Sequence, residues 1–170
     1  LSRMNKKKII KLKRFNKKYI TKKYIQWLNN KDLMQYSDRG HMQHNKESCT
    51  KYLKSFKNSD DKFFAIIDKN TKEHVGNITV IIDKINITAD VGILIGKNNQ
   101  GYGLVAWREM INYLFSKKIR KITGGATINN KAMIKIFKKS KMKLEYIKIK
   151  HYLDKKNKPI DCIYYCIFNK

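Results

Sequence analysis

The spacing of hydrophobic residues along the chain changes between a period of two and a period near 3.6. Apolar residues alternate with basic ones from 8 to 15 ("KIIKLKRF"), which predicts a strand. From 19 to 28 the large apolar residues instead fall at helical spacing ("YITKKYIQWL"). Asn45 is a suitable N-cap for a second helix over 46–56. The same reasoning predicts strands at 62–69, 74–83, 85–96, 120–127, 141–153 and 160–168, and helices at 104–116 and 129–140.

The predicted elements follow one another as strand, two helices, three strands, helix, strand, helix and two strands. This order favours a mixed α/β (α+β) fold around one sheet of about seven strands, flanked by about four helices. The chain has 170 residues, one proline and no glycine- or serine-rich stretch. We therefore predict a single domain over 1–170.

Charge is the most unusual feature of the composition. The formal net charge is +26 at pH 7, and only five of the 39 basic residues are arginine. This charge favours an anionic partner, which could be a nucleic acid, a membrane or a small molecule. An A- and T-rich genome would also produce it, because its codons favour lysine, isoleucine and asparagine. The lysines are spread along the chain without a helix-turn-helix, zinc-finger or RNA-binding aromatic signature, so nucleic-acid binding is disfavoured.

The cysteines and the apolar runs indicate the compartment. Cys49, Cys162 and Cys166 are an odd number without close pairing, which argues against a disulfide framework. No apolar run approaches the ~18 residues needed to span a membrane. We therefore expect a cytoplasmic protein with no membrane partner, and leave a homodimer open.

Two of the eight glycines, Gly101 and Gly103, lie two residues apart between the predicted strand at 85–96 and the predicted helix at 104–116. A glycine turn in this position can cradle an anion, because free backbone N–H groups and the helix dipole face it. A P-loop is excluded, since the second motif glycine is followed by tyrosine. The dinucleotide fingerprint is formally matched by both glycines and Ala106, but no acidic residue follows the next strand. A coenzyme A pyrophosphate loop is the third interpretation.

Two stretches taken together, "VGILIGKNNQGYGLVAWREMINYLF" and "ITGGATINNKAMIKIFKKSKMKLEY", resemble the GNAT superfamily of acetyl-CoA-dependent N-acetyltransferases. The resemblance covers residues 11–146 and is nearest to the branch of ribosomal-protein-alanine and amino-sugar acetyltransferases. It implies a mostly antiparallel sheet that splays at the cofactor cleft, with acetyl-CoA as cosubstrate and no metal. The family's loop, Gln/Arg-x-x-Gly-x-Gly/Ala, falls on 98–103, where Asn98 departs from the usual first residue.

The resemblance also implies which residues hold acetyl-CoA. Amides of the loop and the first helical turn would bind the pyrophosphate, and the backbone of the preceding strand would align the pantetheine arm. Asn130 would hydrogen-bond that arm, and Phe137 would pack near the thioester. The full predicted set is Ile93, Leu94, Ile95, Asn98, Asn99, Gln100, Gly101, Tyr102, Gly103, Leu104, Asn130 and Phe137. Many relatives place a tyrosine acid at the position of Phe137, so here another donor or the product amine must protonate the leaving thiolate.

Acetyl transfer to an amine requires a neutral nitrogen, whereas an alkyl ammonium has a pKa of about 10.4. Asp90, in "ITADVGILIG", is the candidate base, because many relatives carry a glutamate at this point of the strand. It would act directly or through water, and a strand amide would stabilise the oxyanion. An ordinary solvated strand carboxylate is the alternative.

A second cluster of polar side chains lies between the first two predicted helices. The loop "QYSDRGHMQHN" is similar to the loop that borders the acceptor site in amino-sugar-modifying relatives. Its candidate acceptor residues are Tyr36, Ser37, Arg39, His41 and His44. A metal site is disfavoured, because no third ligand has fitting spacing. A solvated loop with one or two buried anchors is the alternative.

These features predict an acetyl-CoA-dependent N-acetyltransferase that acts on a primary amine, with an amino sugar carried on a nucleotide as the leading acceptor. The net charge supports an anionic acceptor, because it would repel cationic amines. N-terminal acetylation of a protein, of the ribosomal-protein type, is the alternative within the same class. A basic nucleic-acid-binding module is the alternative outside it.

Overall fold

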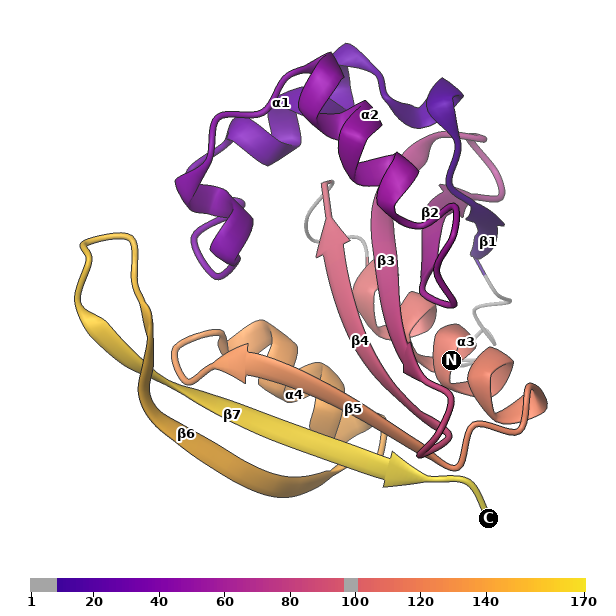
Figure 1. Ribbon diagram of the computed structural model, residues 1–170, viewed down its shortest axis with the longest axis vertical. Coiled ribbons are helices and arrows are strands. Elements are labelled where there is room, and N and C mark those ends of the chain that lie inside the picture. Colours follow the sequence, from indigo (N-terminus) through magenta and orange to yellow (C-terminus); the bar gives the residue numbers. More distant parts are fainter. Residues whose placement is uncertain (1–8, 97–100) are drawn as a thin grey trace, which may run out of the picture.

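The computed structural model describes residues 9–96 and 101–170, which form one sheet with helices on both faces (Figure 1). The elements in chain order are β1 (Ile10–Arg14), η1 (Lys17–Tyr19), α1 (Lys22–Asn29), η2 (Asp38–His41), α2 (Lys46–Ser55), β2 (Lys62–Asp68), β3 (His74–Asp83), β4 (Thr88–Ile95), α3 (Tyr102–Ser116), β5 (Lys121–Thr127), α4 (Lys131–Lys139), β6 (Lys143–Leu153) and β7 (Pro159–Phe168). The predicted order of strands and α-helices is confirmed, and the short 3₁₀ helices η1 and η2 are additions to it.

The seven strands lie in the order β1-β2-β3-β4-β5-β7-β6. Neighbouring strands are antiparallel, except that β4 and β5 are parallel. The predicted mixed α/β class with a mostly antiparallel sheet is therefore confirmed.

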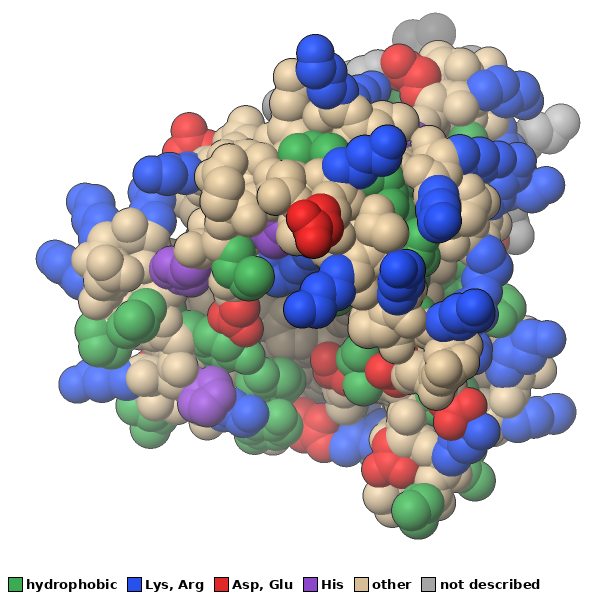
Figure 2. Space-filling view, turned by 45° about the horizontal axis from the view of Figure 1, so that its top comes forward, with side chains coloured by type: hydrophobic (Ala, Val, Ile, Leu, Met, Phe, Trp, Pro, Cys, Tyr) green, Lys and Arg blue, Asp and Glu red, His purple; other side chains and the backbone are tan. Residues whose placement is uncertain are grey.

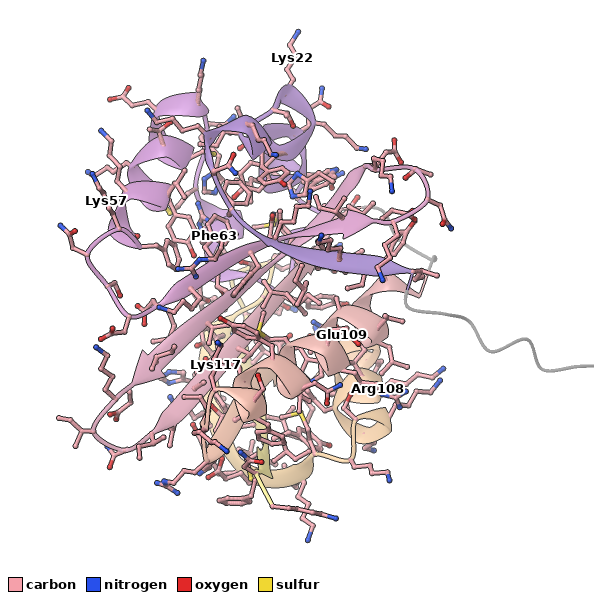
Figure 3. All side chains as sticks on the ribbon, turned by 90° about the vertical axis from the view of Figure 1, so that its right-hand side faces the viewer. Lys22, Lys57, Phe63, Arg108, Glu109 and Lys117 are labelled. Atoms are coloured by element: carbon pink, nitrogen blue, oxygen red, sulfur yellow. The ribbon has the colours of Figure 1, made fainter. Side chains whose placement is uncertain are left out.

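Strand β2 shows why helices cover both faces of the sheet. Six of its seven residues are buried, and its side chains alternate between two apolar clusters. Phe64 and Ile66 belong to the cluster shared with α3 and α4, whereas Phe63 and Ala65 belong to the cluster shared with α1 and α2. Figure 3 shows these layers from the side, with Phe63 between the sheet and the α1–α2 layer. A strand that is apolar at consecutive positions presents apolar side chains to both faces of the sheet, so both faces must be covered by other elements.

Capping side chains determine where the helices begin. The hydroxyl of Thr21 accepts a hydrogen bond from the Tyr24 amide at 3.2 Å, so α1 begins at Lys22 and not at residue 19. The predicted cap at Asn45 is confirmed: its side-chain oxygen accepts from the Ser48 amide at 2.8 Å. The hydroxyl of Ser48 in turn accepts from the Asn45 amide at 3.0 Å, which completes a capping box.

Strands β4 and β5 pair over three positions only, from Thr88–Lys121 to Asp90–Thr123. Beyond them β4 stays paired with β3 as far as Ile95, while β5 stays paired with β7 as far as Thr127. The two strands therefore diverge, and the far half of β4 has one free edge. The predicted splay of the sheet is confirmed, and it creates the cleft described next.

Candidate active site

A cleft of about 830 Å³ lies where β4 and β5 diverge. Its lining comes from both layers of the molecule: Ile95, Gly103 and Ile136 belong to the α3–α4 side, whereas Tyr52 and Phe63 belong to the α1–α2 side. Figure 2 shows the molecule hollowed on one face, with basic and acidic side chains around the hollow. Two substrates could therefore meet at the gap in the sheet from opposite sides.

The turn ahead of α3 presents free backbone donors to this cleft. Gly101 has φ +74°, a left-handed conformation that favours glycine, and no side chain caps the helix that follows. A Cβ atom at Gly101 would have no other heavy atom within 4 Å, so the turn faces open space. The first amides of α3 are thus available to an anion such as a pyrophosphate. The predicted contacts at Asn98, Asn99 and Gln100 lie outside the described residues.

The second glycine of the turn sets the distance between two helices. A Cβ atom at Gly103 would lie 3.0 Å from Cδ1 of Ile136 in α4 and 3.6 Å from Cγ1 of Ile95 in β4. Gly103 and Leu104 line the cleft as predicted, but the side-chain position of residue 103 faces α4. A methyl group at residue 103 would therefore require the Ile136 side chain to shift, whereas Gly101 is the residue that opens toward a ligand.

Tyr102 contributes its backbone to the cleft and its side chain to the fold. Its hydroxyl donates a 2.6 Å hydrogen bond to Oδ2 of Asp68, and both residues are buried. This bond and the backbone amides of Thr71 and Asn70 hold the pKa of Asp68 below its usual value. The same bond raises the pKa of Tyr102 to about 12. Because the hydroxyl is committed to Asp68, only the amide of Tyr102 is left for a pyrophosphate.

The free edge of β4 and the start of α4 form the opposite sides of the gap. Ile93, Leu94 and Ile95 line the cleft, and the backbone N–H and C=O groups of Ile93 and Ile95, which face the β5 side, have no strand partner. Asn130 also lines the cleft, and its side-chain oxygen accepts from the Met133 amide at 3.1 Å to cap α4. Its amide nitrogen is then the group left to bind an extended polar arm.

Phe137 does not lie where the resemblance implied. It is fully buried, and it does not line the cleft. Its ring packs on Tyr165 at 5.0 Å and on Trp107 at 5.3 Å between centroids. The reason is the spacing of α4, which places Met133 and Phe137 one turn apart on the buried face. Phe137 is a core residue, and we remove it from the predicted cofactor contacts.

Asp90 lies at the last paired position before β4 and β5 diverge. The hydroxyl of Thr123 donates to its Oδ1 at 2.7 Å. Asp90 is exposed as a residue, but the protein around its carboxyl removes part of its hydration and raises its pKa, while the Thr123 bond and the charge of Lys148 partly oppose this shift. Asp90 does not line the cleft itself, but Gly92, two residues along on the same face, does. A Cβ atom at Gly92 would lie 3.0 Å from Oγ1 of Thr79, so glycine lets β4 and β3 approach closely beside Asp90.

Three of the five predicted acceptor residues line the cleft: Tyr36, Ser37 and Arg39. The hydroxyl of Ser37 accepts from the Arg39 amide at 3.3 Å and caps η2. The guanidinium carbon of Arg39 lies 3.8 Å from the centroid of the Tyr52 ring. No carboxylate within 9–96 or 101–170 forms an ion pair with Arg39. A half-buried cation without an acidic partner thus faces the α1–α2 side of the cleft.

The two predicted histidines lie elsewhere. His41 is exposed and does not line the cleft. His44 is buried, its Nε2 lies 2.8 Å from the Arg39 carbonyl oxygen, and its backbone exchanges two 2.7 Å hydrogen bonds with the side chain of Asn29. His44 therefore anchors the loop between α1 and α2, which is the structural alternative stated above, and neither histidine lines the cleft.

The sequence interpretation missed several residues that line the α1–α2 side of the cleft. They are Tyr24, Leu28, Asp32, Leu33, Met34, Gln35, Tyr52, Phe63, Asn77 and Thr79. The aromatic ones gave no signal that distinguishes a cleft wall from a core. Asn77 did give one, because it is the polar residue at a buried position within the apolar run of β3.

Metal and membrane features were searched over the described residues. No group of three or more His, Cys, Asp and Glu side chains is arranged to hold a metal ion in residues 9–96 and 101–170. Within the same residues, no helix is both long enough and apolar enough to cross a membrane.

The free edge of β4 can bind an extended polar arm, and the uncapped start of α3 can bind an anionic group such as a pyrophosphate. Residues 11–143 match the family model of the acetyltransferase (GNAT) domain. The chain therefore belongs to the GNAT acetyltransferase family, and it is an acyl-CoA N-acyltransferase.

Solved structures with the same fold include acetyltransferases with different acceptors. The spermidine N-acetyltransferase from Vibrio cholerae, in complex with CoA and spermine, has a TM-score of 0.84 at 15% identity and covers 95% of this chain and 96% of its own. The ribosomal alpha-N-protein acetyltransferase RimL, in complex with coenzyme A, has a TM-score of 0.84 at 17% identity over 94% of each chain. The microcin self-immunity acetyltransferase MccE, in complex with acetyl-CoA and AMP, has a TM-score of 0.80 at 19% identity over 94% and 92%. No curated protein matches the chain by sequence.

Proposed function

We propose that this acetyltransferase acts on a primary amine that also carries a negatively charged group, with a nucleotide-linked amino sugar as the leading acceptor. The observation that carries the proposal is Arg39, a half-buried guanidinium that lines the acceptor side of the cleft without an acidic partner. A guanidinium in this state forms strong paired hydrogen bonds with phosphate or carboxylate oxygens. The net charge of +26 acts in the same direction.

The described residues fit coenzyme A. Gly101 and the uncapped start of α3 would hold the pyrophosphate, and the free edge of β4 with Asn130 would hold the pantetheine arm. When bound, acetyl-CoA supplies an activated acetyl group. The chain's own part is to place an amine at the gap between β4 and β5, and to stabilise negative charge on the acetyl oxygen with a backbone amide of β4.

Asp90 is the proposed proton acceptor. It lies at the vertex of the gap, and partial desolvation of its carboxyl raises its pKa. Because Gly92 separates it from the cleft, we propose that it takes the amine proton through one water molecule. Attack of the neutral nitrogen on the acetyl carbon then breaks the carbon–sulfur bond. The proton for the departing thiolate comes from the product amine or from a donor other than Phe137.

The acceptors of the structural neighbours define the alternatives. The same fold occurs in RimL, an alpha-N-protein acetyltransferase, and in a spermidine N-acetyltransferase, so a protein N-terminus and a polyamine are the alternative acceptors. The AMP in the MccE complex shows that the fold can also accommodate a nucleotide. The guanidinium of Arg39, which has no acidic partner among the described residues, favours a nucleotide-linked acceptor over a polyamine, which it would repel. We also propose a cytoplasmic location, since the three cysteines are free and buried.

The test is an acetylation screen with saturating acetyl-CoA and four classes of amine: a UDP-linked amino sugar, an aminoglycoside, spermidine and a basic N-terminal peptide. We expect the UDP-linked amino sugar to give the highest kcat/KM. A higher kcat/KM for spermidine or the peptide would contradict the proposed anionic acceptor and leave the acetyltransferase assignment intact.

A further inference from the structure

Asn77 is a buried polar residue with an unused donor. It is 4% exposed and lines the cleft from β3, opposite Leu94 of β4. Its side-chain oxygen lies 2.8 Å from Nε2 of His74. Its amide nitrogen is buried and has no hydrogen-bond partner among the described residues. A buried donor without a partner destabilises the ligand-free protein. Its position on the wall of the cleft suggests that a ligand supplies the missing partner.

His74 fixes the orientation of this amide. Its ring lies 5.1 Å from those of Tyr19 and Trp27, and burial lowers its pKa, so the imidazole is neutral near pH 7. A neutral imidazole has one N–H, and the carbonyl oxygen of Asn77 can only accept. With the Asn77 oxygen facing His74, this bond requires the proton on Nε2, and the amide nitrogen of Asn77 then points away from His74.

A β-bulge brings these two residues to the same face. The register between β2 and β3 shifts at Ile66 and Ile67, so that Gly76 pairs with Ile66 but His74 pairs with Ile67. Without the shift, residues three apart on a strand would face opposite sides. With it, His74 packs against the α1 aromatic rings while Asn77 lies on the same side of the sheet.

The surroundings of Asn77 on this side of the cleft are aromatic and offer hydrogen-bond donors. Tyr24, Tyr52 and Phe63 line the cleft, with Tyr52 and Phe63 in edge-on contact at 5.5 Å. Burial raises the pKa of Tyr24 to about 12 and also raises that of Tyr52, and the charge of Arg39 opposes both shifts. Both tyrosines therefore stay neutral. The charged cleft residues on this side are Arg39 and Asp32, and Asp32 pairs with Lys155 at 3.6 Å, which leaves Arg39 as the cation without an acidic partner among the described residues.

We propose that Asn77 and Arg39 together form an oxyanion subsite that binds a phosphate or carboxylate group of the acceptor, and that His74 is its positioning residue. The subsite rests on the proposed anionic acceptor and adds to it the second donor and the residue that aims it. An oxyanion accepts from the guanidinium and from the Asn77 amide together, which gives the buried nitrogen its missing partner. Neither Asn77 nor His74 belongs to the pyrophosphate turn or to the pair of Asp90 and Thr123.

The test uses inorganic phosphate and acetate as probes, with the protein saturated with coenzyme A so that the pyrophosphate turn is occupied. Side-chain N–H resonances of Asn77 and Arg39 are followed by NMR, with sodium chloride at matched ionic strength as the control for general screening. We expect one probe to shift both resonances saturably. If only phosphate shifts the two resonances, the acceptor bears a phosphate. If only acetate shifts them, the acceptor bears a carboxylate. If neither probe shifts the Asn77 resonance beyond the chloride control, the subsite does not exist.

Two pairs of variants separate the subsite from the fold. Asn77→Leu removes the donor without adding charge, so it should raise the probe Kd by at least about tenfold with coenzyme A affinity unchanged, whereas Asn77→Gln keeps a carboxamide and should bind the probe more tightly than Asn77→Leu. His74→Phe keeps the ring in its aromatic surroundings but removes the N–H, whereas His74→Gln supplies an N–H at a similar place. We expect weaker probe binding in His74→Phe and restored probe binding in His74→Gln.

Each failure has a distinct meaning. Probe binding that depends on Arg39 but not on Asn77 would overturn the subsite and leave the anionic acceptor standing. Long-range ¹H–¹⁵N spectra report the tautomer of His74 in the absence of any acceptor. The proposed subsite requires the Nε2–H tautomer. An Nδ1–H tautomer would turn the oxygen of Asn77 toward the cleft and overturn the inference directly.

Discussion

The hydroxyl of Tyr102 donates a 2.6 Å hydrogen bond to the carboxylate of Asp68 and fastens the first residue of α3 to the end of β2. Asp68 in turn accepts from the amides that begin the β2–β3 turn, at 2.7 Å from Asn70 and 2.9 Å from Thr71. The turn that would hold the pyrophosphate is therefore tied to the sheet through a side chain that never touches the ligand.

Replacement of that hydroxyl should weaken both the fold and the binding of coenzyme A. In Tyr102→Phe the carboxylate of Asp68 loses its strongest partner, and the start of α3 loses its anchor. We expect a lower Tm and a several-fold higher Kd for coenzyme A, measured by calorimetric titration. Unchanged values of both would show that the bond does not position the turn.

The same pair predicts a pH dependence. The pKa of Asp68 is depressed in the folded protein, so its contribution to stability is present above the unfolded value of about 3.9 and is lost as the pH falls through the folded value. The stability difference between the wild type and Tyr102→Phe should therefore shrink on acidification below about pH 4. Urea titrations at several pH values measure this difference, and a constant difference would exclude the assigned coupling.

Gly101→Ala tests the open side of the turn. An alanine at φ +74° is strained by about 1 kcal/mol, and its methyl group points into open space where the pyrophosphate would lie. We expect a roughly tenfold higher Kd for coenzyme A, which corresponds to about 1.4 kcal/mol. Gly103→Ala is the matched control, since its methyl group meets Ile136 and should lower the Tm more than it changes the Kd. The reverse pattern would place the phosphate contact at Gly103.

Asp90→Asn tests the proton acceptor. Loss of a general base should lower kcat by about 10²-fold and leave the KM for acetyl-CoA nearly unchanged. Because partial desolvation of its carboxyl raises the pKa of Asp90, the acidic limb of the pH–rate profile should lie above the value for a fully hydrated aspartate. Lys148→Met removes the charge that opposes this shift, so the limb should move to higher pH, whereas Lys148→Arg should leave it in place. If the acidic limb lies at the same pH in Lys148→Met as in the wild type, the limb belongs to a group other than Asp90.

Phe137→Tyr restores the residue type that many relatives use as an acid. The position is fully buried between Trp107 and Tyr165, where a hydroxyl lacks a polar partner and should cost about 1–3 kcal/mol of stability. We expect a lower Tm and no gain in kcat. A gain of tenfold or more would mean that the side chain reaches the departing thiolate after all.

Much of the fold can be predicted from the sequence because the spacing of hydrophobic residues distinguishes the strands from the helices. Strand β2 is apolar at successive positions, and Asn45 caps α2 through a residue three places away, so both are readable within a short window. The glycine turn is readable in the same way, since φ +74° at Gly101 needs glycine.

The parts that could not be predicted depend on contacts distant in the chain. His44 is held by Asn29, fifteen residues earlier, so nothing near it distinguishes an anchor from an acceptor contact. Gly103 owes its role to Ile136 of α4. The juxtaposition of His74 and Asn77 requires a bulge that only strand pairing reveals. Phe137 is the exception, because its spacing from Met133 was a readable sign of burial.

The central claim, that the acceptor is an anionic amine held by Arg39, is tested most directly by the initial rate of acetylation as a function of ionic strength, with acetyl-CoA saturating. For a UDP-linked amino sugar we predict that kcat/KM falls as salt rises from low to physiological levels, where the Debye length shrinks to about 8 Å. In Arg39→Ala, kcat/KM should be lower and its slope against salt shallower, while the KM for acetyl-CoA stays unchanged. A rate that rises with salt, with spermidine or a basic peptide as the preferred acceptor, would contradict the account.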